Sequence, residues 1–257
     1  MRVLCIGDVI GTVGCEFLRK TLPQFKKVKG VDFVICNGEN SADGNGILPT
    51  SASHLFTSGV DVITLGNHAF QRKEIHNYLD EEETIIRPYN FPSPSTPGRG
   101  YCTVDLGRTT VTVINLMGQE FMDARVDNPF YAVDKILKDV DSKIIFVDMH
   151  AEATSEKIAM AYYLDGRVSA FFGTHTHVQT ADERVLENGT GYISDLGMTG
   201  PIDSVIGVKK EIIINRFKTK LPERFEYANG ACMMDCVIFD VDDKSGKTIS
   251  VERYKLR

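Results

Sequence analysis

The sequence lacks the features that identify several large classes of protein. It contains no tryptophan, and none of its apolar runs approaches the 18 residues of a membrane-spanning helix. Positive charge is not in excess, since 29 Lys and Arg against 35 Asp and Glu give a formal net charge of -6. Such an acidic chain is not expected to bind membranes or to make extended contacts with nucleic acids. The first apolar run ends at Asp8 and is too short for a signal peptide, so the sequence predicts a cytoplasmic protein.

The six cysteines have no spacing typical of a zinc site or of a disulfide framework. Cys232 and Cys236 are four residues apart, and no second pair matches them. We therefore predict reduced, buried and unreactive thiols. A chain of 257 residues can bury about 70 to 75% of the surface of its unfolded state, so it needs no disulfide or metal to fold. Any metal that it binds is then expected to serve its function.

The sequence shows no boundary between domains. No repeat of 20 to 50 residues is visible, and the patterns on both sides of the irregular segment 88–100 are of one kind. This segment holds four of the nine prolines, which remove backbone donors, and it predicts a long loop. We expect a single domain over residues 1–257, in which segments 88–100 and 117–128 shape a pocket. A homo-oligomer is compatible with the sequence.

Short β-branched runs alternate with segments of helical periodicity. Because these runs are apolar on both faces, they predict parallel strands buried between layers of helices. Runs 232–241 and 248–254, joined by turn residues, predict an antiparallel hairpin. The expected fold class is therefore α/β, with mixed β-sheets flanked by helices. Strands are predicted at 3–6, 33–36, 60–65, 110–116, 143–147 and 168–172, and helices at 16–25, 51–58, 129–140 and 154–164.

Polar side chains follow five of these strands directly. In open α/β sheets, ligands bind beyond the carboxyl ends of the strands, so the side chains are expected to meet at one edge. They are carboxylates, amides and imidazoles without a thiolate, which suits iron or manganese at least as well as zinc. Seven ligands exceed the three or four of a single zinc site, so two metal ions are expected, with Glu39 bridging them. The candidate ligands are Asp8, Glu39, Asn40, Asn67, His150, His175 and His177.

Each candidate also has an ordinary structural explanation. Asp8 and Glu39 could cap helices, and Asn67 could hold a left-handed turn. His175 and His177 are harder to explain in this way, because residues two apart in an extended segment face the same side and can converge on one centre. The coincidence of such residues at five strand ends favours a site.

Other histidines and glycines are assigned structural roles. His54 and His76 lie in stretches of helical spacing, so we expect both outside the site. Gly7, Gly11 and Gly14 match neither a dinucleotide-binding fingerprint nor a phosphate-binding loop, and they predict a tight turn at the metal edge.

The ordered blocks Gly-Asp8, Gly-Glu39-Asn40, Gly-Asn67-His68, His150 and Gly-Thr-His175-Thr-His177 resemble the calcineurin-like metallophosphoesterases. The similarity is closer to their bacterial YmdB-like branch of cyclic-nucleotide phosphodiesterases and extends from residue 1 to about residue 205. It includes the segment 195–201. The first block has Ile10 where many members have a histidine ligand, and Ala69 follows His68 where many members have an acidic residue. The partner that orients His68 is therefore not evident from the sequence.

The resemblance implies a sandwich of mixed sheets with the active site at the carboxyl ends of the strands. It also implies two divalent or trivalent metal ions, with iron or manganese favoured and zinc or magnesium as alternatives. By resemblance, Asn40 replaces the missing histidine ligand. One ion is assigned to Asp8, Glu39, Asn40 and His177, and the other to Glu39, Asn67, His150 and His175.

A reaction follows from this arrangement. Two metal ions held by these residues would supply a metal-bound hydroxide for attack on phosphorus, and His68 would be free to act as general acid, because imidazole groups exchange protons near neutral pH. The leading hypothesis is hydrolysis of a 2',3'-cyclic or 3',5'-cyclic nucleotide. The alternatives are a phosphomonoesterase acting on nucleotides or small phosphate esters, and a regulatory RNA- or protein-binding module with a residual metal site.

Overall fold

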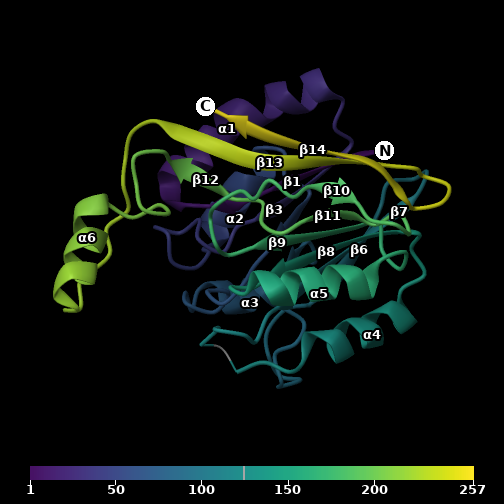
Figure 1. Cartoon of the computed structure of the whole chain (residues 1–257), viewed down its shortest axis with the longest axis horizontal. Helices are drawn as coiled ribbons and strands as arrows, with labels where there is room; N and C mark the ends of the chain where they lie inside the picture. The colour runs from purple at the N-terminus through teal and green to yellow at the C-terminus, as the bar shows by residue number, and fades with distance from the viewer. Residues whose placement is uncertain (124) are drawn as a thin grey trace.

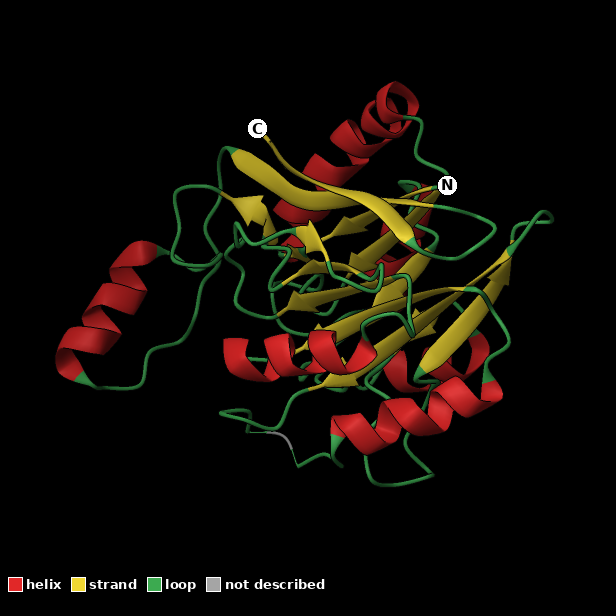
Figure 2. Cartoon of the chain, turned by 45° about the vertical axis from the view of Figure 1, so that its right-hand side comes forward, coloured by secondary structure: helices red, strands yellow, loops and turns green. Residues whose placement is uncertain are grey.

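Two β-sheets lie face to face between two groups of helices (Figures 1 and 2). The structure is a computed structural model that describes residues 1–123 and 125–257. Within these residues, the first sheet contains β1 (Arg2–Ile6), β2 (Asp8–Val9), β3 (Phe33–Asn37), β4 (Val62–Thr64), β5 (Ile85–Ile86), β12 (Met198–Pro201), β13 (Cys232–Val241) and β14 (Thr248–Leu256). The second contains β6 (Tyr101–Asp105), β7 (Thr110–Met117), β8 (Ile144–His150), β9 (Ala170–Thr174), β10 (Arg184–Val185) and β11 (Gly191–Ile193).

Both sheets combine parallel and antiparallel pairs. The first sheet has the order β2-β12-β13-β1-β3-β4-β5, with β14 paired to β13, and the second has the order β10-β11-β9-β8-β7-β6. Strands β1, β3, β4 and β5 are parallel, as are β7, β8, β9 and β11. The antiparallel pairing of β13 with β14 confirms the predicted hairpin. The structure therefore confirms an α/β fold of mixed sheets.

Three apolar clusters hold these layers together. Along β1, Leu4 and Ile6 pack outward against the helices, whereas Val3 and Cys5 pack inward against the second sheet. Alternate residues of one strand therefore belong to different cores, which explains why the strands are apolar on both faces. Helices α1 (Gly11–Lys29), α2 (Pro49–Thr57) and α3 (Ile75–Glu81) pack on the first sheet, and α4 (Pro129–Asp139) and α5 (Thr154–Leu164) pack on the second.

Several element boundaries differ from the prediction. Strand β8 continues beyond residue 147 to His150, because β7 and β9 pair with it as far as that residue. Asp148 therefore lies within a strand, where the hydroxyl groups of Thr64 and Thr174 donate hydrogen bonds to its buried carboxylate. All six cysteines are free and buried, as predicted.

One of the three N-terminal glycines, Gly14, serves helix packing and not a turn, which corrects the prediction for that residue. Helix α1 begins at Gly11, whose left-handed φ of 59° fits the predicted turn, and Gly14 follows in the first turn of the helix. A Cβ at residue 14 would lie 2.5 Å from the carbonyl oxygen of Thr199 in β12. Gly14 thus allows the close approach of α1 to the first sheet. Gly7 does lie in the tight connection between β1 and β2, where a Cβ would lie 2.2 Å from the carbonyl oxygen of Gly197.

The predicted loop at 88–100 joins the two sheets between β5 and β6, and one buried arginine organises it. The Arg87 guanidinium donates hydrogen bonds to five backbone carbonyls over 2.8–3.3 Å. Burial lowers the pKa of Arg87. The five acceptors are the carbonyl oxygens of Pro88, Tyr89, Thr96, Pro97 and Gly98.

Replacing Arg87 should therefore loosen this loop and destabilise the protein. We expect Arg87→Met to lower the free energy of unfolding by about 2 to 4 kcal/mol, because several carbonyls lose a charge-assisted partner at once. Denaturant unfolding measures this change. Arg99→Met is the matched control, since Arg99 is exposed and pairs with exposed Glu83, and it should cost less than about 1 kcal/mol. Equal stability of the two variants would contradict the role of Arg87.

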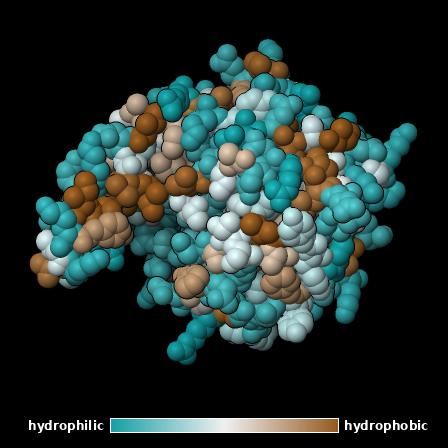
Figure 3. Space-filling view, viewed as in Figure 1, coloured by the Kyte–Doolittle hydropathy of each residue, from teal (hydrophilic) through white to brown (hydrophobic). Residues whose placement is uncertain are grey.

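Helix α6 (Lys210–Thr219), which the sequence did not predict, projects from the sandwich beside β12 (Figure 1). Of its side chains only Ile213 is buried, while Ile214 and Phe217 are exposed. Figure 3 shows an apolar area on this arm. The helix thus adds nothing to the three cores. In the part of the chain that the structure describes, no helix combines the length and the apolar character needed to cross a membrane.

Candidate metal centre

All eight predicted site residues come together where the carboxyl ends of strands from both sheets meet. Asp8 begins β2, two residues after β1, and Glu39 and Asn40 follow β3. From the second sheet, His150 is the last residue of β8, and His175 follows β9. The first sheet thus supplies Asp8, Glu39, Asn40, Asn67 and His68, and the second supplies His150, His175 and His177.

One half of the site is built around Asp8. The carboxylate of Asp8 is fully buried, and its Oδ1 lies 3.6 Å from Nε2 of His177. Its Oδ2 accepts a hydrogen bond from the backbone N–H of His175 at 3.2 Å. The amide nitrogen of Asn40 lies 3.3 Å from the same His177 nitrogen. Asp8, Asn40 and His177 therefore form a contiguous group.

The other half is built around His150. Three atoms surround its Nε2: Oδ1 of Asn67 at 2.9 Å, Nδ1 of His175 at 3.0 Å and Oε1 of Glu39 at 3.0 Å. Oε1 of Glu39 also accepts a hydrogen bond from the Asn40 amide at 3.4 Å, so Glu39 touches both halves. This arrangement places Glu39 between the two groups of residues.

Each of the three histidines proposed as ligands has its other ring nitrogen occupied. Nδ1 of His150 lies 2.9 Å from Oγ1 of Thr174, and Nδ1 of His177 lies 3.0 Å from the carbonyl oxygen of Ile206. Nε2 of His175 lies 3.1 Å from the Glu152 carboxylate. Metal-bound histidines almost always donate their second N–H to such acceptors, which fixes the tautomer and leaves one lone pair for the ion.

The charges of the site favour a cation. Burial disfavours the charged imidazole, but the Asp8 carboxylate outweighs this effect and raises the pKa of His177 to about 9. Burial also opposes the ionisation of Asp8, yet contact with His177 holds the pKa of this carboxyl well below its usual value. Burial, together with the positive charge of neighbouring His150, lowers the pKa of His175 to about 3. Two buried carboxylates thus attract positive charge while His175 stays neutral, as a metal ligand must.

The residues present fit a metal centre on two further observations. Oδ1 of Asp8 is a buried carboxylate oxygen that has no hydrogen-bond partner among the described residues. Nε2 of His150 can supply at most one proton, although three potential acceptors surround it. Ligand atoms of Glu39, His150 and His175 all lie within 4.8 Å of one another. Buried oxygen and nitrogen acceptors that lack hydrogen-bond donors and lie this close together are suited to binding a cation.

His68 does not join either group of ligands. Its Nδ1 lies 2.9 Å from Oδ1 of Asn40, and its backbone N–H donates to Oε2 of Glu39 at 3.0 Å. Asn40 therefore supplies the orienting partner that could not be assigned from the sequence. The His68 side chain is 34% exposed, whereas Glu39 is buried, so the imidazole lies at the open side of the site. His54 lies in α2 and His76 in α3, outside this cluster, as predicted.

The prediction that His175 and His177 lie in an extended segment is wrong. Both residues have left-handed backbone conformations, with φ of 103° and 62°. The two imidazoles still reach the same site, but each enters a different half of it. Non-glycine residues with positive φ are uncommon, and such strain is found most often at functional sites.

Further residues position the site and were not predicted. Asp148 and Thr174 form a buried chain behind His150, because the Thr174 hydroxyl donates to Asp148 at 2.8 Å and can then accept from His150. Burial raises the pKa of Asp148 to about 7. Asp195 accepts hydrogen bonds from the backbone of Thr176 and from the buried ammonium of Lys157, at 3.1 and 2.8 Å. Asp195 thereby fixes the segment that carries His175 and His177.

Only some of these residues left a signal in the sequence. Glu152, which contacts His175, lies two residues after His150, where a search for carboxylates beside the ligands could have found it. Thr174 lies immediately before His175, but a threonine in a strand gives no reason to expect a role in the site. Lys157 lies on the buried side of α5 and belongs to no recognisable motif.

Gly66 separates β4 from Asn67 and leaves room for a ligand. A Cβ at this position would lie 2.3 Å from Cδ2 and 2.4 Å from Nε2 of His150. We therefore expect Gly66→Ala to displace the imidazole and to weaken metal affinity by about 10- to 100-fold, as loss of support for a ligand typically does. Metal titration followed by mass-spectrometric metal analysis measures this effect. Unchanged affinity would show that the His150 ring is not held where the structure places it.

The family model and a curated relative both match this chain over nearly its whole length. The family model of the YmdB-like proteins matches residues 4–254. Over 255 residues, the chain is 45% identical to a 2',3'-cyclic-nucleotide 2'-phosphodiesterase of Bacillus subtilis (strain 168), covering 98% of this chain and 96% of that protein.

Two solved structures are similar over nearly their full lengths. A hypothetical protein from Thermus thermophilus superimposes with a TM-score of 0.93 at 41% identity, covering 99% of this chain and 98% of that one. A novel phosphatase from Mycoplasma pneumoniae superimposes with a TM-score of 0.95 at 33% identity, covering 100% of this chain and 93% of that one. The shared architecture therefore includes both sheets.

Proposed function

This chain belongs to the YmdB-like family, and we propose that it hydrolyses 2',3'-cyclic nucleotides at the candidate metal centre. The family relationship makes the chain a phosphoric-ester hydrolase. The finer assignment to the cyclic diester is supported by the activity in the name of the Bacillus subtilis relative. The observation on which it depends here is the arrangement of ligands in two groups joined by Glu39.

The two groups assign the residues that would hold metal. Asp8, Asn40 and His177 would bind one ion and Asn67, His150 and His175 the other, with the Glu39 carboxylate shared between them. Bound there, two cations would activate water and neutralise charge on the phosphate. Carboxylate, amide and imidazole ligands suit iron or manganese, with zinc and magnesium as alternatives.

His68 would act on the departing oxygen. Its Nδ1 faces the Asn40 carbonyl, so Nε2 is the ring atom that is free to deliver a proton. The Glu39 carboxylate also lies near this ring, with Oε1 3.7 Å from Nδ1. Opening a 2',3'-cyclic phosphate releases a ribose hydroxyl, and this poor leaving group needs such a proton.

Substrate comparison tests the proposal. We expect the metal-loaded protein to convert 2',3'-cyclic AMP to the 3'-monophosphate at least about tenfold more efficiently, in kcat/KM, than it hydrolyses 3',5'-cyclic AMP or adenosine 3'-monophosphate. Chromatographic separation of the products measures all three reactions. An Asp8→Asn variant is the control for contaminating hydrolases, because it removes a proposed ligand without altering side-chain size. Faster turnover of the 3',5'-cyclic substrate would move the assignment to that diester.

A phosphomonoesterase is the second candidate, and the name of the Mycoplasma pneumoniae relative favours it. The same residues would hold the metal in that reaction, so only the substrates separate the two activities. Faster hydrolysis of the monophosphate than of either diester would support this alternative. Turnover of none of the three substrates by a metal-loaded protein would favour a binding module with a residual metal site.

A further inference from the structure

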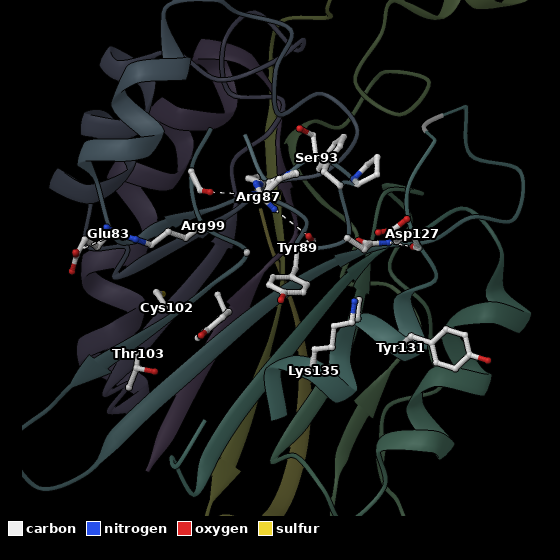
Figure 4. A pocket seen from close by; sticks show the side chains of 18 of the residues that line it. Glu83, Arg87, Tyr89, Ser93, Arg99, Cys102, Thr103, Asp127, Tyr131 and Lys135 are labelled. Atoms are coloured by element: carbon white, nitrogen blue, oxygen red, sulfur yellow. Dashed lines mark hydrogen bonds and ion pairs between the residues drawn. The ribbon is translucent and has the colours of Figure 1, made fainter. Parts of the chain in front are cut away.

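A large cavity lies away from the metal centre, beneath loop 88–100. It is open to the surface, has a volume of about 1140 Å³ and is lined by this loop, by β6 and by the first turns of α4 (Figure 4). None of the eight residues of the candidate metal centre lines it. A volume of this size accommodates a ligand of several hundred daltons.

The walls of the cavity are held in place by buried polar contacts. Arg87 fixes the loop through its five carbonyl acceptors. Asn90 exchanges two hydrogen bonds with the backbone of Met117, at 2.8 and 2.9 Å, and donates a third to the carbonyl oxygen of Asp127 at 2.8 Å. The cavity is therefore formed before any ligand arrives, which lowers the entropic cost of binding.

One cationic side chain of the cavity is available to an anion. The guanidinium of Arg87 is taken up by backbone carbonyls, and Arg99 pairs with Glu83 at 3.0 Å. Lys135 of α4 contacts no carboxylate within 4.0 Å in the described part of the chain. In Figure 4 the Lys135 side chain extends from the helix toward Tyr89 in the middle of the cavity. An anionic group placed there would find an unpaired ammonium.

An aromatic surface and an acceptor complete the lining. The rings of Tyr89 and Tyr101 lie 6.2 Å apart with their planes inclined by 54°, and Tyr89 faces the cavity from the loop (Figure 4). Asp127 also lines the cavity, and its backbone carbonyl accepts a hydrogen bond from Asn90. A ring can pack on tyrosine, and a carboxylate accepts hydrogen bonds from hydroxyl groups.

We propose that this cavity is a second binding site that takes a nucleoside monophosphate. The base would pack against Tyr89, the phosphate would pair with Lys135, and the ribose hydroxyls would donate to Asp127. This ligand is matched by all three features together, whereas inorganic phosphate would use only Lys135. The site goes beyond the proposed activity and does not depend on it.

Binding stoichiometry tests the proposal. Equilibrium dialysis of the metal-loaded protein against adenosine 3'-monophosphate should show two molecules bound per chain, one at each site. Lys135→Glu should weaken binding at the cavity by at least about tenfold, through loss of one charge pair and gain of a repulsion, and leave kcat unchanged. Lys138→Glu is the matched control, because it introduces the same change of charge on the same helix at a residue that does not line the cavity. This control should retain both sites.

Two further variants separate the sources of binding. Asp8→Asn should retain the cavity site alone. Tyr89→Leu should weaken binding of adenosine 3'-monophosphate at the cavity but leave binding of inorganic phosphate unchanged. Absence of binding in Asp8→Asn, or unchanged affinity of the cavity site in Lys135→Glu, would overturn the proposal. Absence of phosphodiesterase activity would overturn the proposed function but would leave these stoichiometries to decide the second site.

Discussion

His68→Ala is expected to lower kcat for a 2',3'-cyclic nucleotide by about 10²- to 10⁴-fold, the usual contribution of a general acid, while the bound metal is unchanged. The imidazole contacts Asn40 and Glu39 but lies outside both groups of ligands, so its loss removes a proton donor and leaves the ligands in place. Steady-state kinetics and elemental analysis of the same preparation measure the two quantities. A variant that loses metal in proportion to activity would show that His68 supports the ligands instead.

The leaving group provides a sharper criterion for the same role. A p-nitrophenyl phosphodiester releases an anion that needs no protonation, so its turnover should fall much less in His68→Ala than turnover of the cyclic nucleotide. His54→Ala is the matched control, because His54 lies in α2, outside the site, and its ring faces exposed Glu16 at 3.6 Å. It should leave both substrates unaffected. Equal losses for the two substrates in His68→Ala would exclude proton donation to the leaving oxygen.

Removal of metal by a chelator should lower turnover by at least about a thousandfold without unfolding the protein. The proposed chemistry needs the positive charge of the ions, which is worth several kcal/mol in the transition state. The three apolar cores do not include any of the proposed ligands, so the fold does not depend on the ions. The free energy of unfolding should fall only by the binding contribution, about 3 to 4 kcal/mol for each ion at 100 to 1,000 times Kd.

Circular dichroism and thermal unfolding of the chelated protein measure this separation of folding from activity. Adding back manganese or iron should restore turnover in the unaltered protein but not in Asp8→Asn, whose ligand set is incomplete. A chelated protein that loses its secondary structure would show that the ions are structural. Full activity after complete removal of metal would remove the basis of the proposed mechanism.

The position of the site could be predicted from the sequence because it follows from a general rule of sheets with parallel strands. Parallel strands deliver their carboxyl ends to one edge, so polar residues after successive apolar runs had to meet there. This argument needs only the strand order along the chain, and it brought together residues as distant as Asp8 and His177. It does not establish that they bind metal, which stays a prediction.

Other parts of the site depend on contacts that no local pattern records. Thr174 and Asp148 matter because β8 and β9 are neighbours and because Thr64 approaches from the other sheet. The left-handed backbone at His175 and His177 depends on Asp195, which is held by a lysine from a separate helix. Secondary-structure propensity and hydrophobic periodicity describe single segments of the chain, so they cannot predict contacts between the layers of the fold.

The pairing of β13 with β1 determines the stage of protein synthesis at which the metal centre can form. Strand β1 pairs with β13 over all of its residues, and the N–H of Gly7, beside Asp8, donates to the carbonyl oxygen of Asp235 at 3.1 Å. The segment that presents Asp8 is therefore completed by residues near the end of the chain. A nascent chain on the ribosome would already contain every proposed ligand yet lack the strand that holds the first of them in place. Metal capture should accordingly follow synthesis of β13.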